Sequence, residues 1–487
     1  MMFNQPININ QRYFLLILYA VILCVFGPTM YWITHRESST PVPGGKNSIE
    51  KRVSLGDKIL VTAHNNSAKQ AGVNAFDQGD YVEAQEDFSS ALKSDRNDPE
   101  ARIYLNNTIA AKTKDPEQIG VSVPIGGDLG AAEEILRGVA QAQTEINNNG
   151  GINGKALMVK IANDDNNPDL AREIANAFVK DKQVSAVVGH NDSNASIAAA
   201  PIYEQAGVVM ITPTSSAEVL STMGDYIFRS TPSTRYLAET LAEYTVNVAH
   251  KDKIAMCIDS DAQVSVSFQE NFTWAVYNHG GKIIPLDCDL AAADFSPTEI
   301  PSQAISSGAD ALLLAPSVRK VDKAVEIIIA NDERLTLLGN HSLNSYQTLK
   351  QGQNNVNGMV LTVPWYPPQA KNSFTEDAQK LWGGSVNWRT AMAYDATKTI
   401  STGMASSQER EQLQQVLANP GFTTKGATTS IGFLPSGDRN LKGSLIKIQP
   451  GNKSGTGYDF VALEEKDLLS PKSNPSTATT IPQSQSK

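Results

Sequence analysis

Two short runs rich in hydroxyl side chains, GHNDSNAS at residues 189–196 and TPTSS at residues 212–216, have the residue types that could do chemistry. Such runs could supply a nucleophile, a phosphate-binding loop or a cradle for a ligand that is released unchanged. A nucleophile elbow needs Gly-x-Ser-x-Gly, which neither run contains, and no acid–base pair stands out. The run GGINGK at residues 150–155 lacks the spacing and the following Ser or Thr of a phosphate loop. The sequence therefore predicts reversible binding and no enzyme activity.

Metal ions, cofactors and nucleic acids are not expected as partners. The six histidines form no pair at the spacing of metal ligands. The formal net charge is −10 and the chain has no basic block, which argues against binding to nucleic acid. Cys257 and Cys288 fall in strand-like segments, which favours two buried thiols. Their spacing also suits neighbouring strands, so a disulfide between them is the alternative.

The elements around the two hydroxyl-rich runs follow an α/β pattern. From Ile119 onward, short and nearly continuous apolar runs alternate with amphipathic helix patterns. This alternation is typical of parallel sheets covered by helices on both faces. The number of units predicts two sheets, with a break at residues 229–241. Ligands of such sheets bind beyond the carboxyl ends of the strands, which is where both runs fall.

Two serines in these runs are expected to cap helices. Ser193 and Ser216 each precede a helix pattern, as N-cap residues do. Two helix N-termini that face one crevice would offer unpaired N–H groups to a carboxylate or another small anion. The hydroxyls of Ser193, Thr214 and Ser216 would complete that cradle. The alternative is that both serines cap helices without any ligand.

Residues 118–463 resemble the type I periplasmic solute-binding proteins, in the branch that includes leucine/isoleucine/valine-binding proteins and related receptor ligand-binding domains. The resemblance is carried by segments such as AVVGHNDSNASIAAAPIYEQAGVVMITPTSS, GDYIFRSTPS and NWRTAMAYDATKTI. It implies two α/β lobes that close on a solute, no catalysis, and delivery of the solute to an ABC permease. We expect lobe 1 at residues 118–236 and 365–425, and lobe 2 at residues 237–364 and 426–463.

The resemblance also implies site residues. The family's carboxylate-binding positions match Ser193, Thr214 and Ser216. Amino-acid binders of the family tend to carry aromatic residues in the second lobe, and Gln263 and Ser317 stand near those positions here. The acidic partner of an α-ammonium would fall near His341. An uncharged His341 cannot supply that charge, so the second lobe departs from the pattern for an ordinary α-amino acid. Asp259 and Asp261 lie at a neighbouring strand end and are the alternative source of charge.

The N-terminal part predicts a membrane anchor. After a tail at residues 1–12, residues 13–34 are uncharged and long enough to cross a bilayer, with Tyr13, Tyr31 and Trp32 near the ends. A cleaved signal peptide is the rival interpretation, but no Ala-x-Ala site follows. Basic residues after the span argue weakly against an exported body. Because long domains translocate largely regardless of such charges, the resemblance places the body on the periplasmic or extracellular side.

Three further segments complete the chain. Residues 35–65 are polar and rich in Pro, Gly and Ser, which predicts a linker. Residues 66–114 resemble a tetratricopeptide repeat, with two helix patterns joined by DQGD. A single repeat cannot form the usual peptide-binding array, so a helical spacer or a docking module is expected. Residues 464–487 form a polar tail that is expected to be disordered.

The sequence therefore predicts a single-pass membrane protein whose two-lobed body binds a small carboxylate-bearing ligand, such as an amino acid or a related small anion. Its expected role is to supply an ABC-type transporter. The alternative is a sensor, in which closure of the lobes is passed through the tetratricopeptide-like segment to a signalling partner.

Overall fold

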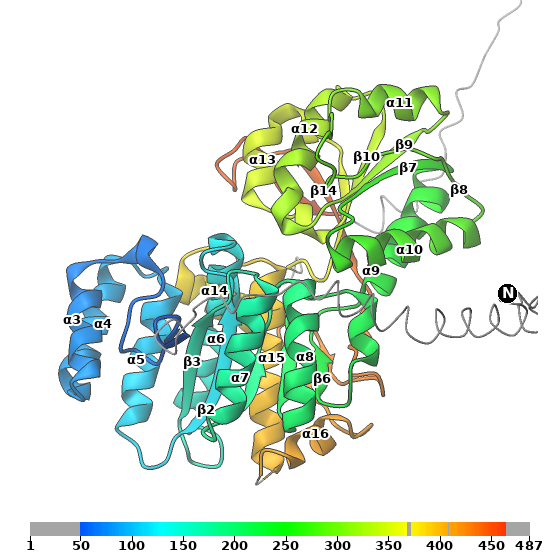
Figure 1. The fold of residues 1–487 in the computed structure, drawn as a ribbon. Coiled ribbons are helices and arrows are strands. Elements are labelled where there is room, and N and C mark those ends of the chain that lie inside the picture. Colours follow the sequence, from blue (N-terminus) through cyan, green and yellow to red (C-terminus); the bar gives the residue numbers. More distant parts are fainter. Residues whose placement is uncertain (1–48, 368–371, 408, 464–487) are drawn as a thin grey trace, which may run out of the picture. The chain divides into compact units, whose positions relative to one another are not determined.

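The computed structural model describes residues 49–367, 372–407 and 409–463 (Figure 1). The predicted membrane helix at residues 13–34 and the predicted tail at residues 464–487 lie outside this range. Within the described residues, no helix combines the length and the apolar character that a membrane crossing requires. The described residues from Lys51 onward form one unit by their contacts, and the lobes described below belong to it.

The first lobe is built on a six-stranded sheet with the order β1-β3-β2-β4-β5-β6. Its parallel strands are β2 (Glu117–Val123), β3 (Leu157–Asn163), β4 (Val184–Val188), β5 (Val209–Thr212) and β6 (Ile227–Arg229). Strand β1 (Val53–Ser54) joins the edge antiparallel to β3. Helices cover both faces of this sheet (Figure 1), as its nearly continuous apolar strands require.

The helices of this lobe fall into two layers. One face carries α5 (Pro99–Ala111), α6 (Leu129–Asn148) and α15 (Trp388–Ser406), and the other carries α7 (Pro168–Lys180) and α8 (Ser193–Ala206). The remaining elements lie beside α6 and α15: α14 (Ser373–Trp382), α16 (Gln412–Leu417), β12 (Thr424–Lys425) and β13 (Ser430–Ile431).

The second lobe is built on a seven-stranded sheet with the order β15-β14-β11-β10-β9-β7-β8. Its parallel strands are β7 (Lys253–Ile258), β8 (Lys282–Ile283), β9 (Ala311–Ala315), β10 (Thr336–Gly339) and β11 (Val360–Val363). A hairpin of β14 (Ser444–Pro450) and β15 (Tyr458–Ala462) adds antiparallel to β11. The helices of the second lobe are α9 (Thr234–Glu243), α10 (Gln263–Asn278), α11 (Ile300–Ser306), α12 (Val321–Asn331) and α13 (Tyr346–Gly352).

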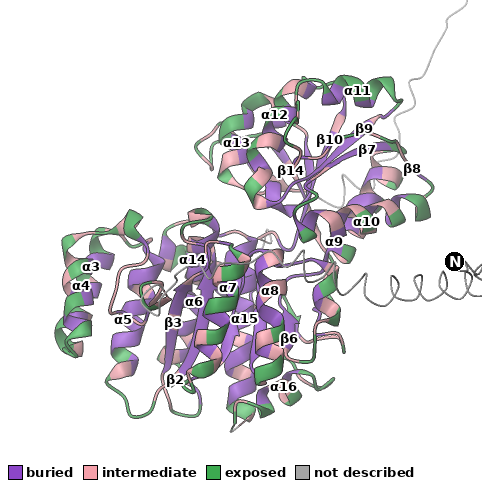
Figure 2. Ribbon diagram, in the orientation of Figure 1, coloured by how far each residue is buried: buried purple, intermediate pink, exposed green. Residues whose placement is uncertain are grey.

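Short helical turns connect several of these elements. They are η1 (Thr62–His64), η2 (Glu218–Thr222), η4 (Val318–Lys320), η5 (His341–Leu343) and η6 (Gln353–Val356), with a π-helical turn, η3 (Tyr244–Val248), after α9. The strands of both sheets are buried, while the outward faces of the surrounding helices are exposed (Figure 2). The predicted two-lobed α/β fold with mostly parallel sheets is confirmed.

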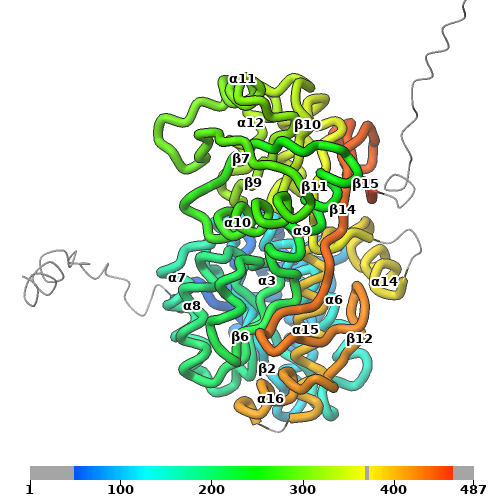
Figure 3. Tube along the Cα trace, turned by 90° about the vertical axis from the view of Figure 1, so that its right-hand side faces the viewer, coloured from blue at the N-terminus to red at the C-terminus, as the bar shows by residue number. Residues whose placement is uncertain are grey.

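The chain passes between the lobes more than once. It crosses between β6 and α9, between β11 and α14, and between β13 and β14, and Figure 3 shows the last crossing as the orange stretch that leads to β14. The last crossing comes later than the expected boundary at residue 426. Two buried ion pairs, Arg439 with Asp395 and Arg229 with Asp438, hold the preceding segment on the first lobe.

The segment before the two lobes packs as three helices. In α3 (Ser67–Asp77) and α4 (Tyr81–Ser94), Gly72 leaves room for the Phe88 ring, since an added Cβ would lie 2.8 Å from that ring. Helix α5 packs against α6 and β3, so this segment is fused to the first lobe. The linker expected at residues 35–65 was wrong for its last part, because Val53 and Ser54 pair with Ile161 and Ala162 as strand β1.

A buried ion cluster fixes these helices. The Nζ atom of Lys69 lies 2.7 Å from Asp98 and 2.8 Å from Glu100, and all three side chains are fully buried. Glu100 also accepts hydrogen bonds from the backbone N–H groups of Leu60 and Val61. Burial alone would lower the pKa of Lys69, but Glu100 and Asp98 hold that pKa above its usual value. The lysine is therefore a compensated buried cation.

Helices α6 and α15 touch through their backbones. A Cβ atom added to Gly138 in α6 would lie 2.2 Å from the carbonyl oxygen of Thr390 in α15. No side chain fits in that space, so glycine at this position sets how closely the start of α15 approaches α6.

A disulfide joins Cys257, in β7, to Cys288 in the segment after β8, with an S–S distance of 2.06 Å. The expectation of two buried thiols was therefore wrong. The two segments run side by side, because the N–H of Ile258 donates to the Cys288 carbonyl and the N–H of Leu290 donates to the Ile258 carbonyl. The spacing of the two cysteines allows this pairing, but the sequence does not show that the segments are neighbours.

Candidate functional site

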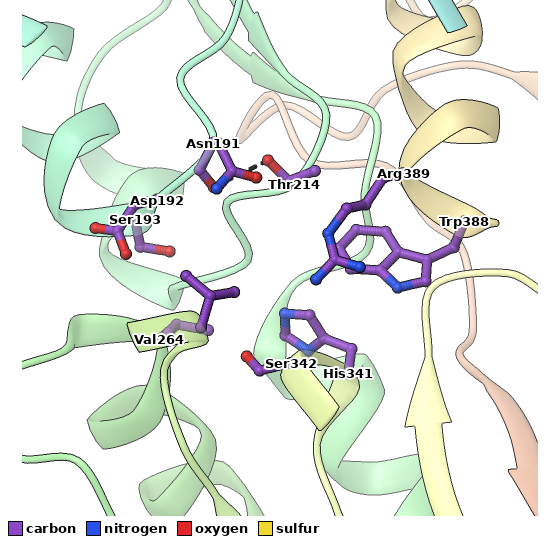
Figure 4. Close-up of a pocket in the computed structure, with 10 residues that line it drawn as sticks. Asn191, Asp192, Ser193, Thr214, Val264, His341, Ser342, Trp388 and Arg389 are labelled. Carbon is purple, nitrogen blue, oxygen red and sulfur yellow. Dashed lines mark hydrogen bonds between the residues drawn. The ribbon is translucent and has the colours of Figure 1, made fainter. Parts of the chain in front are cut away.

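A cavity lies where the carboxyl ends of the two sheets face each other (Figure 4). The space that atoms leave between its walls is about 330 Å³, a figure that includes open solvent. Both lobes line it: Asn191, Asp192, Ser193, Thr214, Trp388 and Arg389 come from the first lobe, and Val264, Val318, His341 and Ser342 come from the second. The cavity is therefore shared between the lobes, and most of the residues that line it are polar.

The loop after β4 brings the start of α8 to the cavity. Asp192 is the N-cap of this helix, and its carboxylate accepts the N–H of Asn194 at 2.9 Å. Ser193 is the first helical residue, so the expectation that it caps the helix was wrong. Its hydroxyl lines the cavity and accepts the N–H of Ala217 at 3.4 Å. Burial raises the pKa of Asp192, whose nearest basic partner is Arg319 at 3.9 Å.

The loop after β5 brings Thr214 to the cavity, where its hydroxyl donates to the Asn191 carbonyl at 2.9 Å. Ser216 does not cap a helix, because the turn that follows is the short η2, whose N-cap is Ala217 with no side-chain bond. The expectation of a second capped helix N-terminus was therefore wrong. Ser216 is buried beside the cavity, and its hydroxyl lies 3.4 Å from Nε2 of His341.

Gln263, Ser317 and His341 are the positions of the second lobe that were expected to bind the ligand. Of these three, His341 lines the cavity. The N–H of Gln263 donates to Asn194 across the lobes at 2.9 Å, while its neighbour Val264 faces the cavity. Ser317 is buried, and its neighbour Val318 faces the cavity. Gln263 and Ser317 are therefore each one residue away from a side chain that lines the wall.

His341 lies in η5, directly after β10, and is nearly fully buried. Burial, and then the charge of Arg389, lowers the pKa of His341 to about 3, so the imidazole is neutral at physiological pH. Its Nδ1 atom has no hydrogen-bond partner among the described residues. A Ser216–His341 pair without an orienting carboxylate, at 3.4 Å, does not form a catalytic triad.

The sequence analysis missed the start of α15. Asn387 caps this helix and places Trp388 and Arg389 on the cavity wall. The Arg389 guanidinium lies over the Trp388 ring at 4.4 Å and donates to the Asn344 carbonyl of the second lobe at 3.3 Å. Figure 4 shows Arg389 beside the Trp388 ring, with His341 below both. The signal that could have found it is an arginine two residues after a capping asparagine, inside a segment that resembles the family.

Hydrogen bonds also join the lobes around the cavity. Arg319 donates to the Asn166 carbonyl at 2.7 Å, and Asn194 donates to the Asp261 carbonyl at 2.8 Å. Asp261, an alternative source of charge in the sequence analysis, thus takes part through its backbone. These bonds hold the two walls of the cavity against each other.

The family model for periplasmic binding proteins matches residues 116–442. The chain belongs to this family. Its members bind solutes and are not enzymes. The match includes every residue that lines the cavity and ends before β14.

Two curated relatives come from Pseudomonas aeruginosa. An amino acid binding protein is 34% identical over 145 residues, which span 29% of this chain and 39% of that protein. A leucine-, isoleucine-, valine-, threonine- and alanine-binding protein is 24% identical over 345 residues, which span 70% of this chain and 91% of that protein. The first alignment thus covers less than half of the relative, and the second covers nearly all of it.

Solved structures share the fold. A leucine-binding protein of Thermotoga maritima matches with a TM-score of 0.62 and 19% identity, over 71% of this chain and 97% of that chain. A solute-binding protein of R. palustris, in complex with 4-hydroxybenzoate, matches with a TM-score of 0.62 and 15% identity, over 71% of this chain and 96% of that chain. At these identities the likeness concerns the fold alone.

Proposed function

We propose that this chain is the membrane-anchored, extracytoplasmic solute-binding component of an ABC-type transporter, and that it binds a small carboxylate-bearing solute between its lobes. The observation that carries the proposal is the cavity shared by both lobes, with hydroxyl groups on one wall and the Arg389 guanidinium on another. A buried cation and hydroxyl donors suit an anionic ligand. The names of the relatives make amino acids the first compounds to compare.

A thermal-shift and calorimetry screen tests this proposal. The full chain, kept in mild detergent, is screened against amino acids, small peptides, amides and organic acids. A compound at 100 times its dissociation constant should stabilise the protein by about 2.7 kcal/mol. Binding of at least one carboxylate-bearing compound is expected. Stabilisation by uncharged amides alone, or by no compound, would refute a carboxylate site in the cavity.

The anchor and the export of the body belong to the same proposal. They rest on the apolar residues 13–34 and on the Cys257–Cys288 disulfide, since disulfides persist in oxidising compartments. We expect the full chain in the membrane fraction after an alkaline wash, and we expect a variant without residues 1–34 to leave that fraction. Equal release of both forms would contradict the anchor.

A sensor is the second candidate, and one observation favours it. Arg52, at the start of the described body, pairs with Asp165 at 2.6 Å, and the next residue, Asn166, accepts the cross-lobe hydrogen bond from Arg319. The N-terminal segment thus contacts a loop that also touches the other lobe. Permease and ATPase genes next to the gene would support transport, and genes for signalling proteins would support the sensor.

A further inference from the structure

Three buried nitrogen atoms, which belong to residues that line the cavity, have no hydrogen-bond partner among the described residues. They are Nε of Arg389, Nε1 of Trp388 and Nδ1 of His341, and all three residues line the cavity. Buried polar groups in native proteins are nearly always paired, so three exceptions around one space need an explanation. Arginine and tryptophan nitrogens are donors only, so the missing partner includes an acceptor. We define Trp388, Arg389 and His341 as the arginine wall.

Arg389 carries the positive charge of the arginine wall and forms no ion pair. It is buried, and within the described part of the chain no carboxylate lies within 4.0 Å of it. Burial lowers the pKa of its guanidinium, while the more distant charges of Asp128 and Glu134 raise it, and arginine stays protonated in proteins. An isolated buried charge is costly unless a partner of opposite sign compensates it. A ligand anion at this wall would supply both the charge and the missing acceptors.

The opposite wall already contains a carboxyl group, that of Asp192, which lies 3.9 Å from the Arg319 guanidinium. The Asp192 carboxylate occupies the N-terminus of α8, where the sequence analysis had expected the ligand carboxylate. Figure 4 shows Asp192 and Ser193 across the cavity from Arg389. A ligand carboxylate beside Ser193 would face the Asp192 charge, whereas at the arginine wall it would face a cation. The charges of the site therefore favour the arginine wall.

An α-ammonium has no place in that orientation. An α-amino acid carries its two charges on one carbon, so a carboxylate on Arg389 brings the ammonium close to the guanidinium. The single acidic side chain in the cavity lining is Asp192, on the other wall, and His341 is neutral. The ammonium would thus meet a like charge and lose its water without gaining a partner. The same skeleton without the ammonium avoids both penalties.

We propose that the ligand is a small carboxylic acid without an α-ammonium group, whose carboxylate binds the arginine wall. The apolar side chains of Val264 and Val318 face the body of such an acid, and the hydroxyls of Ser193 and Thr214 are available to polar groups at its far end. The inference rests on the proposed function, because it takes the cavity to be the solute site. It reverses the carboxylate position that the family resemblance implied.

Matched ligand pairs test this inference on the full chain in mild detergent. L-Alanine, L-valine, L-leucine, L-phenylglycine and L-aspartate are compared by calorimetry with propanoate, 3-methylbutanoate, 4-methylpentanoate, phenylacetate and succinate, which lack the ammonium. We expect at least one ammonium-free acid to bind about tenfold or more tightly than its amino acid. The Arg389→Gln variant should bind that acid about 30-fold or more weakly than the wild-type protein does. The Thr214→Val variant should lose less than about fivefold in affinity.

Each other outcome has a defined meaning. Tighter binding of the amino acids, or a larger loss for Thr214→Val than for Arg389→Gln, would overturn the inference and leave the proposed function in place. Binding of no acid from either set would overturn the inference, and the absence of any carboxylate-bearing ligand in the wider screen would also refute the proposed function. Should Arg389→Gln fail to fold, Arg389→Lys replaces it. Lysine keeps the positive charge but loses the bidentate hydrogen bonding of arginine, so the affinity for the acid should still fall about tenfold. An unchanged affinity of Arg389→Lys for the acid would then count against the inference. Tighter binding of the amino acids than of the ammonium-free acids to the wild-type protein would do the same.

Discussion

Two buried cations of this protein differ in how their charge is balanced. Lys69, in the helical segment before the lobes, lies between Asp98 and Glu100 at hydrogen-bond distance. Arg389, on the cavity wall, donates one hydrogen bond to a carbonyl and has no carboxylate within 4.0 Å in the described residues. The first cation holds helices together. The second is the cation that we propose binds the carboxylate of the ligand.

The difference separates structural charge from functional charge. A buried cation with two acidic partners contributes little that a ligand could use, because its charge and its donors are satisfied. A buried cation without them destabilises the free protein and gains most when an anion arrives. Burial does not distinguish Lys69 from Arg389, since both side chains are buried. The two residues differ in whether a carboxylate lies within ion-pair distance.

Replacing Lys69 should have the largest effect on stability. Lys69→Met leaves the carboxylates of Asp98 and Glu100 buried without a cation, and the free energy of unfolding should fall by about 3–5 kcal/mol. Urea denaturation followed by circular dichroism measures this loss. Lys93→Met, an exposed lysine in the neighbouring α4, is the matched control and should change stability by less than about 0.5 kcal/mol. Equal effects for both variants would contradict the structural role of Lys69.

The neutral histidine beside Arg389 should give a smaller, pH-dependent effect. The pKa of His341 is about 3 in the folded protein, whereas that of an unperturbed histidine is 6.5, so below about pH 6.5 the unfolded chain binds a proton that the folded one does not. This group therefore lowers stability as the pH falls, by up to about 2 kcal/mol between pH 7 and pH 5. His341→Asn should remove that part of the pH dependence in denaturation experiments. His250→Asn, at an exposed histidine, should leave it in place.

Replacing Arg389 should have the smallest effect on the protein without ligand. Arg389→Met removes an uncompensated charge together with one carbonyl hydrogen bond, so we expect the free energy of unfolding to change by less than about 1 kcal/mol. The same urea experiment measures it, with Lys69→Met as the reference for a compensated cation. A loss of the size expected for Lys69 would show that Arg389 has a structural role and would remove the contrast between the two.

The sequence predicted the fold of this molecule better than it predicted which charged side chains line the cavity. Apolar strands alternating with helices identified both lobes, because parallel sheets leave that pattern in any sequence. Hydroxyl-rich runs at strand ends led to Ser193 and Thr214, and both line the cavity. Arg389 was missed, because an arginine in a helix looks the same in sequence whether it faces solvent or a cavity. The capping positions were wrong by one residue at Ser193, since an adjacent aspartate is an equally good cap.

The contact at Gly138 has a consequence for anyone who wishes to redesign this protein. Thr390, whose carbonyl oxygen occupies the space next to Gly138, directly follows Arg389 in the chain. Any side chain at Gly138 would push the first turn of α15 outward and carry the guanidinium with it. A mutagenesis library limited to cavity-lining residues would leave out this position. Directed evolution of a new ligand preference should therefore include α6, a helix that holds none of the lining side chains.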